Sequence, residues 1–221
     1  LYEYYEAPQI DLLVNDDTIS ISKLIPFIKN IYTFSYQEKL DNRWKQEKNL
    51  ILKVYKKYDL SINLTASDRS IFYALMAGKK SISAVESDNR KSWWKKIFLT
   101  HYYYFNNFKH ILINNLEPLN LLNINFDNIQ THIEVSSEAN LNVNKKLEAF
   151  NVSDFVIFHP STQYNYKIYP QNLRDILLSA LSKLGVSILI TGGNSAIDIG
   201  IKKQLPSLPN VFDFIGETSL E

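Results

Sequence analysis

The apolar residues of this chain fall into short continuous runs, which alternate with longer stretches where apolar residues recur every three or four positions. Short runs are typical of buried strands, and the wider spacing is typical of helices with one buried face. The pattern predicts strands at residues 10–14, 31–36, 60–64, 81–85, 155–158, 186–191 and 211–215. It predicts helices at residues 20–29, 41–57, 68–77, 110–122, 144–149, 170–184 and 194–204. Strands that alternate with helices indicate an α/β fold with parallel sheets.

A few positions carry more specific expectations. Trp44 fits the buried stripe of the helix at 41–57, and the run 155–158 is expected to be a buried strand. Gly78 follows a helix, where a left-handed capping residue is expected. Asn194 is expected to cap the helix that begins after it.

The alternating pattern is interrupted by a polar, Asn-rich segment that separates two halves. We expect a first domain at residues 1–135, a linking region at 136–153 and a second domain at 154–221. The chain starts on Leu1, residues 2–10 lead directly into a strand, and residues 216–221 look like the opening of a helix. We therefore expect a chain that is incomplete at both ends.

Composition narrows the classes of protein. The 221 residues carry a net charge of +1 and no cysteine, which excludes disulfides and thiolate metal sites and favours a cytoplasmic location. The four histidines follow no metal-binding spacing, so no metal is expected. Nucleic-acid binding is not expected, because the net charge is near zero and no recognised motif is present. No apolar run approaches the roughly 20 residues of a membrane span.

One stretch near the middle combines features of an anion site. The strand at 155–158 is followed by a loop of small and polar residues and then by a helix starting near Pro170. The first N–H groups of a helix have no partner within it, so they can bind an anion. The loop adds two hydroxyls and a cation, from Ser161, Thr162 and Lys167, a set that suits a diphosphate. The same residues also fit an ordinary polar loop with a solvated lysine.

A second candidate follows the next strand. Thr191, Gly192 and Gly193 stand between a strand and a helix, and the glycines would let the backbone approach a ligand closely. A plain strand-to-helix turn would have the same composition. Asp198 is the one acid in the following helix, at a spacing that leaves a ligand role doubtful.

The first half offers basic candidates. Residues 79–109 hold seven Lys or Arg and two acids, a balance of +5, together with many aromatic residues. This segment is either a wall that attracts an anionic ligand or lipid, or a buried aromatic anchor with snorkelling lysines. Trp93 and Trp94 are expected in the core. Arg69 follows the carboxyl end of a strand and could pair with a carboxylate, whereas Ser67 or Asp68 would cap the helix there.

Several segments match one family in the same order. They are Ile10-Asp-Leu-Leu-Val14, Tyr58-Asp-Leu-Ser-Ile-Asn-Leu64, Ser67 with Arg69 and Ser70, Gly78-Lys79, His159-Pro-Ser-Thr162, Lys167-Ile-Tyr-Pro170, Ile188-Leu-Ile-Thr-Gly-Gly193 and Phe214-Ile-Gly-Glu-Thr-Ser-Leu220. In these segments the chain resembles the ADP-heptose:lipopolysaccharide heptosyltransferase family, glycosyltransferase family 9. The resemblance implies a GT-B architecture, in which two Rossmann-like domains face each other across a cleft.

The resemblance also implies an activity. Family members are metal-independent inverting transferases that need no cofactor and move a heptose from an ADP-heptose-like nucleotide sugar to the lipid A inner core of lipopolysaccharide. By resemblance, Ser161, Thr162 and Lys167 would bind the donor diphosphate, with Thr191, Gly192 and Gly193 beside the nucleoside. The acceptor side would hold Arg69, Lys95 and Lys96, and the protein would work in the cytoplasm, with peripheral contact to the inner membrane. The family's catalytic acid is expected upstream of Leu1, and its second donor motif beyond Leu220.

Two other hypotheses remain open. One is a different GT-B enzyme, such as a hexosyltransferase or a nucleotide-sugar epimerase, in which the Gly-Gly turn and the diphosphate loop would look alike. The other is a non-catalytic nucleotide-binding remnant, because a fold does not determine function.

Overall fold

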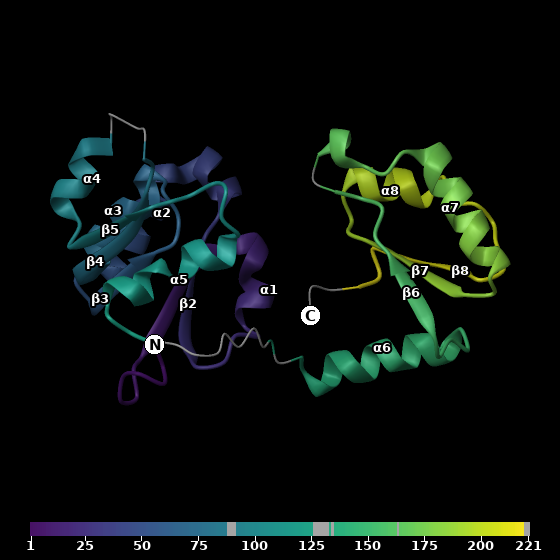
Figure 1. The fold of residues 1–221 in the computed structure, drawn as a ribbon, viewed down its shortest axis with the longest axis horizontal. Coiled ribbons are helices and arrows are strands. Elements are labelled where there is room, and N and C mark those ends of the chain that lie inside the picture. Colours follow the sequence, from purple (N-terminus) through teal and green to yellow (C-terminus); the bar gives the residue numbers. More distant parts are fainter. Residues whose placement is uncertain (88–91, 126–132, 134, 163, 219–221) are drawn as a thin grey trace. The chain divides into compact units, whose positions relative to one another are not determined.

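A computed structural model describes residues 1–87, 92–125, 133, 135–162 and 164–218 (Figure 1). The chain divides into two compact units, Leu1–His132 and Ile133–Glu221. Every strand pair in the described residues is parallel, and helices lie between consecutive strands in most cases. The predicted α/β organisation with parallel sheets is therefore confirmed.

The first unit contains two parallel sheets. One has two strands, β1 (Ile10–Asn15) and β2 (Ile28–Phe34). The other has the order β3-β4-β5, formed by β3 (Tyr58–Asn63), β4 (Gly78–Val85) and β5 (His101–Tyr104). The helices are α1 (Ile19–Ser22), α2 (Tyr36–Val54), α3 (Asp68–Ala77), α4 (Trp93–Phe98) and α5 (Ile111–Leu121), with a 3-10 turn η1 at Asp16–Thr18.

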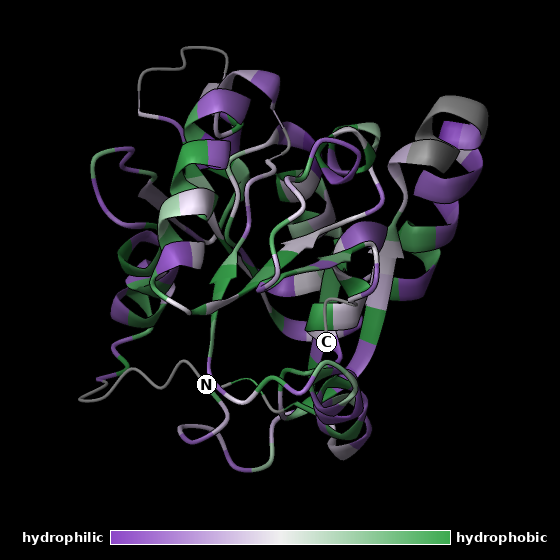
Figure 2. Cartoon of the chain, turned by 90° about the vertical axis from the view of Figure 1, so that its right-hand side faces the viewer, coloured by the Kyte–Doolittle hydropathy of each residue, from purple (hydrophilic) through white to green (hydrophobic). Residues whose placement is uncertain are grey.

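The core of this unit surrounds β4, the middle strand of its sheet. Ile82, Ala84 and Val85 of β4 are fully buried, as is Ile71 of α3. A strand with neighbours on both sides and helices against its faces has no side open to water, so continuous burial is expected there. Figure 2 shows the helices as alternating bands of hydrophobic and hydrophilic residues, the pattern of helices that bury one face.

Two expectations for the first unit are wrong. Trp44 is 84% exposed, because α2 turns its Gln46–Leu50–Val54 stripe inward instead. Gln46 can be buried because its amide hydrogen-bonds the backbone N–H and C=O of Ser35, at 2.6 and 3.0 Å. Gly78 is not a left-handed cap: it is extended, with φ −99°, and opens β4. A Cβ there would lie 2.8 Å from the backbone nitrogen of Ser61, so close strand packing requires the glycine.

Asp11 links the two sheets of the first unit. Its carboxylate accepts hydrogen bonds from Tyr58 at 2.6 Å, Asn30 at 3.0 Å and Lys57 at 3.3 Å. Burial raises the pKa of Asp11, but these hydrogen bonds outweigh it and hold the pKa below its ordinary value. Asp11 and Tyr58 lie near the amino ends of their strands, away from the edge where parallel sheets bind ligands. We therefore interpret this cluster as structural.

The second unit contains one described sheet and three helices. The strand order is β6-β7-β8, formed by β6 (Phe155–Phe158), β7 (Ser187–Gly192) and β8 (Val211–Ile215). The helices are α6 (Ser137–Ala149), α7 (Gln171–Lys183) and α8 (Ala196–Lys202), with a 3-10 turn η3 at Asn165–Lys167. Leu178 of α7 packs with Ile188 and Ile190 of β7 in the core.

Two local expectations for this unit are also corrected. The strand at 155–158 is not buried: β6 pairs only with β7 among the described strands, and Ile157 is 60% exposed. The helix after β7 is capped by Ser195 instead of Asn194, through a capping box with Asp198. Gly185 and Gly216 both have positive φ, at 72° and 77°, a conformation that glycine adopts without strain.

Candidate functional site

The carboxyl edge of the β6-β7-β8 sheet gathers most of the predicted donor-side residues. His159 directly follows β6, and its Nδ1 lies 3.0 Å from the Thr191 hydroxyl near the end of β7. The other ring nitrogen of His159 lies 3.3 Å from the hydroxyl of Ser161. His159 thus joins the loop after β6 to the end of β7. Ligands of open parallel sheets bind at this edge.

Asp198 organises the same edge from α8. It is buried, and its carboxylate accepts hydrogen bonds from the hydroxyl and N–H of Ser195. The hydroxyl of Ser161 and the N–H of Gly193 also act on it as donors that lower its pKa. Burial raises the pKa of Asp198, but these hydrogen bonds outweigh it and hold the pKa below its ordinary value. A Cβ at Gly192 would lie 2.9 Å from Oδ1 of Asp198, so the missing side chain leaves room for the Asp198 carboxylate.

The chain Thr191–His159–Ser161–Asp198 is therefore a continuous polar network at one sheet edge. The sequence pattern predicted Ser161 and Thr191 near this edge. The sequence did not identify Asp198 as the residue that holds this edge together. Its role depends on a residue 37 positions earlier, Ser161, and no sequence motif links two residues that far apart. Since its oxygens are occupied within the network, Asp198 positions the loop and the glycine turn.

Thr162 and Lys167 occupy the exposed part of the loop. The Thr162 hydroxyl donates to the carbonyl of Tyr164 at 2.8 Å and accepts from the N–H of Tyr164 at 3.3 Å, which shapes a local turn. Lys167 Nζ lies 5.3 Å from the ring centre of Tyr164 and 5.6 Å from that of Tyr166. These are cation–π distances. The exposed lysine is thus held over two aromatic rings, outside the Asp198 network.

The first unit has a pocket at the corresponding edge of its three-stranded sheet. Its volume is about 670 Å³. It is lined by the loops that follow β3, β4 and β5, and by the start of α5, through Leu64, Thr65, Ala66, Glu86, Ser87, Phe105, Asn107 and Ile111. Hydroxyl, amide and carboxylate groups beside one aromatic ring suit a ligand rich in hydroxyl groups.

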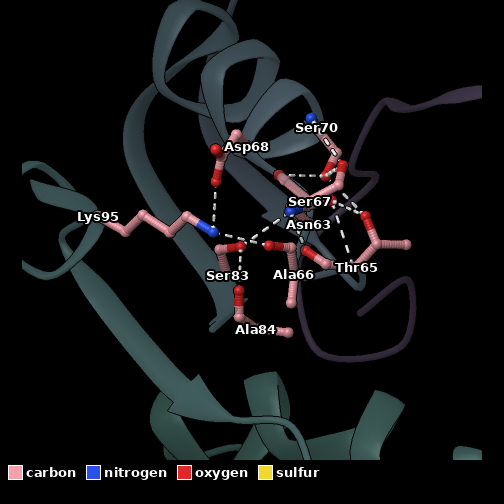
Figure 3. A network of polar contacts seen from close by, with 9 residues as sticks. All are labelled: Asn63, Thr65, Ala66, Ser67, Asp68, Ser70, Ser83, Ala84 and Lys95. Atoms are coloured by element: carbon pink, nitrogen blue, oxygen red, sulfur yellow. Dashed lines mark hydrogen bonds and ion pairs between the residues drawn. The ribbon is translucent and has the colours of Figure 1, made fainter. Parts of the chain in front are cut away.

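A polar network fixes the loop between β3 and α3 that lines this pocket (Figure 3). Asn63 donates from its amide to the Thr65 carbonyl and, at 2.8 Å, to the Ser83 hydroxyl. The Thr65 hydroxyl lies 2.7 Å from that of Ser70, and Ser67 caps α3 by accepting from the Ser70 N–H. Ser67 therefore has the capping role expected as one alternative.

Lys95 closes this network from α4. Its side chain is 1% exposed, and Nζ donates to the Ala66 carbonyl at 2.9 Å and pairs with Asp68 at 2.6 Å (Figure 3). Lys95 was predicted on the acceptor side, within a segment that was either an anion-attracting wall or an aromatic anchor with snorkelling lysines. The structure instead shows it buried beneath the loop, where it holds the backbone that lines the pocket.

The other two acceptor-side candidates also lie outside the pocket lining. The Arg69 guanidinium carbon lies 3.6 Å from the ring centre of Phe34, so Arg69 is stacked on the first unit's own aromatic residue. Lys96 hydrogen-bonds the Tyr104 hydroxyl at 3.0 Å. Trp94 packs against the core as expected, but Trp93 does not, since it is exposed.

The described ranges contain neither a metal-binding group of side chains nor a membrane-spanning helix. There, no three His, Cys, Asp or Glu side chains are grouped so as to bind a metal ion. Among the helices of those same residues, none is both long enough and apolar enough to span a bilayer.

Comparison with known proteins gives one family. The model of glycosyltransferase family 9 (heptosyltransferase) matches residues 48–221. Lipopolysaccharide heptosyltransferase 3 of Escherichia coli (strain K12) is 27% identical over 212 residues, which cover 93% of this chain and 60% of that protein. The matched residues include both candidate edges.

Solved structures of the same family share the fold. A family 9 glycosyl transferase from Veillonella parvula DSM 2008 aligns with a TM-score of 0.76 at 16% identity, covering 95% of this chain and 61% of that one. E. coli heptosyltransferase WaaC with ADP aligns with a TM-score of 0.70 at 14% identity, covering 99% and 67%. E. coli heptosyltransferase WaaC with ADP-2-deoxy-2-fluoro heptose aligns with a TM-score of 0.72 at 12% identity, covering 96% of this chain and 68% of that one.

These likenesses confirm the predicted GT-B fold class with two Rossmann-like units. The chain spans only 60% and 61% of the lengths of the E. coli heptosyltransferase 3 and the Veillonella protein. The family model nevertheless covers most of the chain, and the chain therefore belongs to glycosyltransferase family 9, the heptosyltransferase family.

Proposed function

We propose that the full-length protein transfers a heptose from an ADP-heptose-like nucleotide sugar to the inner core of lipopolysaccharide, by a metal-independent inverting mechanism. The observation that carries this proposal is the family match over residues 48–221, which includes both sheet edges. The name of the E. coli relative and the ADP ligands of the WaaC structures support the same donor and acceptor classes.

In the proposed reaction, an acceptor hydroxyl attacks the anomeric carbon from the face opposite the diphosphate. The anomeric C–O bond breaks, and the bonding electrons leave with the nucleoside diphosphate. Negative charge therefore grows on the phosphate oxygens, and groups that stabilise this charge lower the barrier more than they stabilise bound substrate.

The second unit would supply these groups at its carboxyl edge. The first N–H groups of α7 point toward this edge, and Pro170 provides no side-chain cap for them. Ser161 and Thr162 would contact the diphosphate through the loop after β6, and Lys167 would provide a cation. The nucleoside would lie against Thr191, Gly192 and Gly193, where the absence of side chains allows close approach.

The first unit would take the acceptor. Its pocket offers polar groups and the Phe105 ring, which suit a saccharide. Arg69 and Lys96 lie outside the pocket lining and would contribute only to a larger acceptor surface. We place the reaction in the cytoplasm, with peripheral contact to the inner membrane where the lipid-linked acceptor lies. Salt-dependent pelleting of the protein with anionic vesicles tests that contact.

Donor use tests the proposal most simply. ADP-heptose and UDP-sugars are incubated with the full-length protein and an inner-core acceptor, and release of nucleoside diphosphate is followed. The proposal expects turnover with ADP-heptose. Lys167→Ala should lower kcat at least about tenfold, as loss of one charge-stabilising group does, whereas Lys183→Ala, at the far end of α7, should not. Turnover with UDP-sugars alone would favour another GT-B enzyme.

A further inference from the structure

A buried arginine lies behind the donor-side edge with part of its hydrogen-bonding capacity unused. Arg174, in the first turns of α7, is 1% exposed. Within the described part of the chain, its Nε and Nη2 atoms have no hydrogen-bond partner. The nearest carboxylate is that of the adjacent Asp175, whose Oδ1 lies 3.6 Å from Nε, too far for a hydrogen bond.

The position of Arg174 follows from the topology. Since β6 and β7 are parallel, α7 must run back along the sheet, and its first turn lies at the carboxyl edge. Arg174 is one turn before Leu178, which is fully buried in the core, so both residues lie on the face toward the sheet. Helical side chains lean toward the helix N-terminus. These directions would place the guanidinium toward the edge that also holds Ser161 and Thr191.

Such a group is unfavourable for folding alone. A buried guanidinium keeps its charge, and desolvating it without full hydrogen bonding is costly. The neighbouring carboxylate gives poor compensation, because consecutive helical residues do not face each other. An apolar side chain at this position would continue the Leu178 stripe. A bound anion would neutralise this charge and accept the unused hydrogen bonds of the guanidinium.

We propose that Arg174 binds an anion at the carboxyl edge of the β6-β7-β8 sheet and that, on the function proposed above, this anion is the diphosphate of the nucleotide-sugar donor. The free N–H groups of α7 and the unused Nε and Nη2 of Arg174 converge on one edge and complement the phosphate oxygens. Lys167, exposed over its two tyrosine rings, would then be the outer cation and Arg174 the inner one.

The experiment compares nucleotide affinity with stability. ADP is titrated calorimetrically into the full-length protein and into its Arg174→Leu and Arg174→Lys variants, and thermal melting of each is measured without ligand. Lys183→Leu is the matched control, because it removes one charge from the exposed far end of the same helix. Inorganic pyrophosphate serves as a second probe that lacks the nucleoside.

We expect Arg174→Leu to raise the Kd for ADP and for pyrophosphate at least tenfold while Tm stays equal or rises. Arg174→Lys should lose less affinity, and Lys183→Leu should bind like the parent. Unchanged ADP affinity in Arg174→Leu, or a clear fall in its Tm, would show that Arg174 is structural and refute the proposal. If pyrophosphate binds in an Arg174-dependent way but ADP does not bind, the anion site is supported and the assignment of the anion as the donor diphosphate is refuted. A parent protein that binds neither ADP nor pyrophosphate refutes both the anion site and that assignment.

Discussion

For the pair formed by Lys95 and Asp68, we expect removal of the exposed partner to lower the free energy of unfolding more than removal of the buried one. The Asp68 side chain is 76% exposed, whereas that of Lys95 is 1% exposed. Asp68→Ala leaves the buried Lys95 ammonium without its anion, and an uncompensated buried charge costs about 3 kcal/mol of unfolding free energy. Lys95→Met leaves Asp68 solvated and removes only the donor to the Ala66 carbonyl, which costs about 1 kcal/mol.

The double variant separates this account from simple contact loss. Once Lys95 is methionine, Asp68 has no buried charge to neutralise. The double variant should therefore be about as stable as Lys95→Met alone, so the second substitution restores about 2 kcal/mol to Asp68→Ala.

Tryptophan fluorescence during urea denaturation is a suitable assay. Within residues 1–221 the tryptophans are Trp44, Trp93 and Trp94, all in the first unit, so their fluorescence reports unfolding of that unit. If the two single variants are equally destabilised, or if their effects simply add in the double variant, Lys95 does not carry a buried charge that depends on Asp68. The loop that lines the pocket would then be held by the Asn63 and Ser67 contacts alone.

Three further predictions concern stability. Hydrogen bonds depress the folded-state pKa of Asp198, so its contribution to stability is present above the unfolded pKa of about 4 and is lost as pH falls through the folded pKa. In thermal melting, Asp198→Asn should therefore be less stable than the parent at pH 7. The difference between the two melting temperatures should shrink as the pH is lowered toward about 3. Gly78→Ala should lower the free energy of unfolding by about 2 kcal/mol or more, because the added Cβ overlaps backbone atoms. Gly200→Ala has nothing near its Cβ and should raise the free energy of unfolding by about 0.5–1 kcal/mol in helix α8. Equal changes of the two variants in circular-dichroism melts would contradict this. Arg69→Met should cost about 1 kcal/mol by removing the cation over the Phe34 ring, and an unchanged urea midpoint would argue against that stacking.

The sequence pattern predicted most element types because strands and helices of this fold carry local signals, but it predicted neither α4 nor β5. Alternation of apolar runs and amphipathic stretches depends on neighbouring residues only, and α3 and β8 begin and end where the pattern indicated. The errors came from tertiary context. Trp44 is exposed because the buried face of α2 is shared with a polar residue, Gln46, whose partner is the backbone of Ser35.

The candidate site shows the same division. Ser161 and Thr191 could be predicted because each follows a strand, and parallel strands end at one edge. Lys95 was predicted only as an acceptor-side cation, and Arg174 carried no expectation, because charged residues are rarely buried. Their burial depends on packing between distant segments, which no local pattern records. The ligand roles of the predicted residues stay predictions.

The central claim is that this family 9 protein uses an ADP-linked heptose as its donor. Mass spectrometry of an inner-core acceptor after incubation with the full-length protein and ADP-heptose tests it most directly. We expect the acceptor to gain one heptose while ADP is released in equal amount, and this gain to fall in Arg174→Leu and Lys167→Ala. An unmodified acceptor with intact ADP-heptose, under conditions where a UDP-sugar is consumed, would contradict the claim.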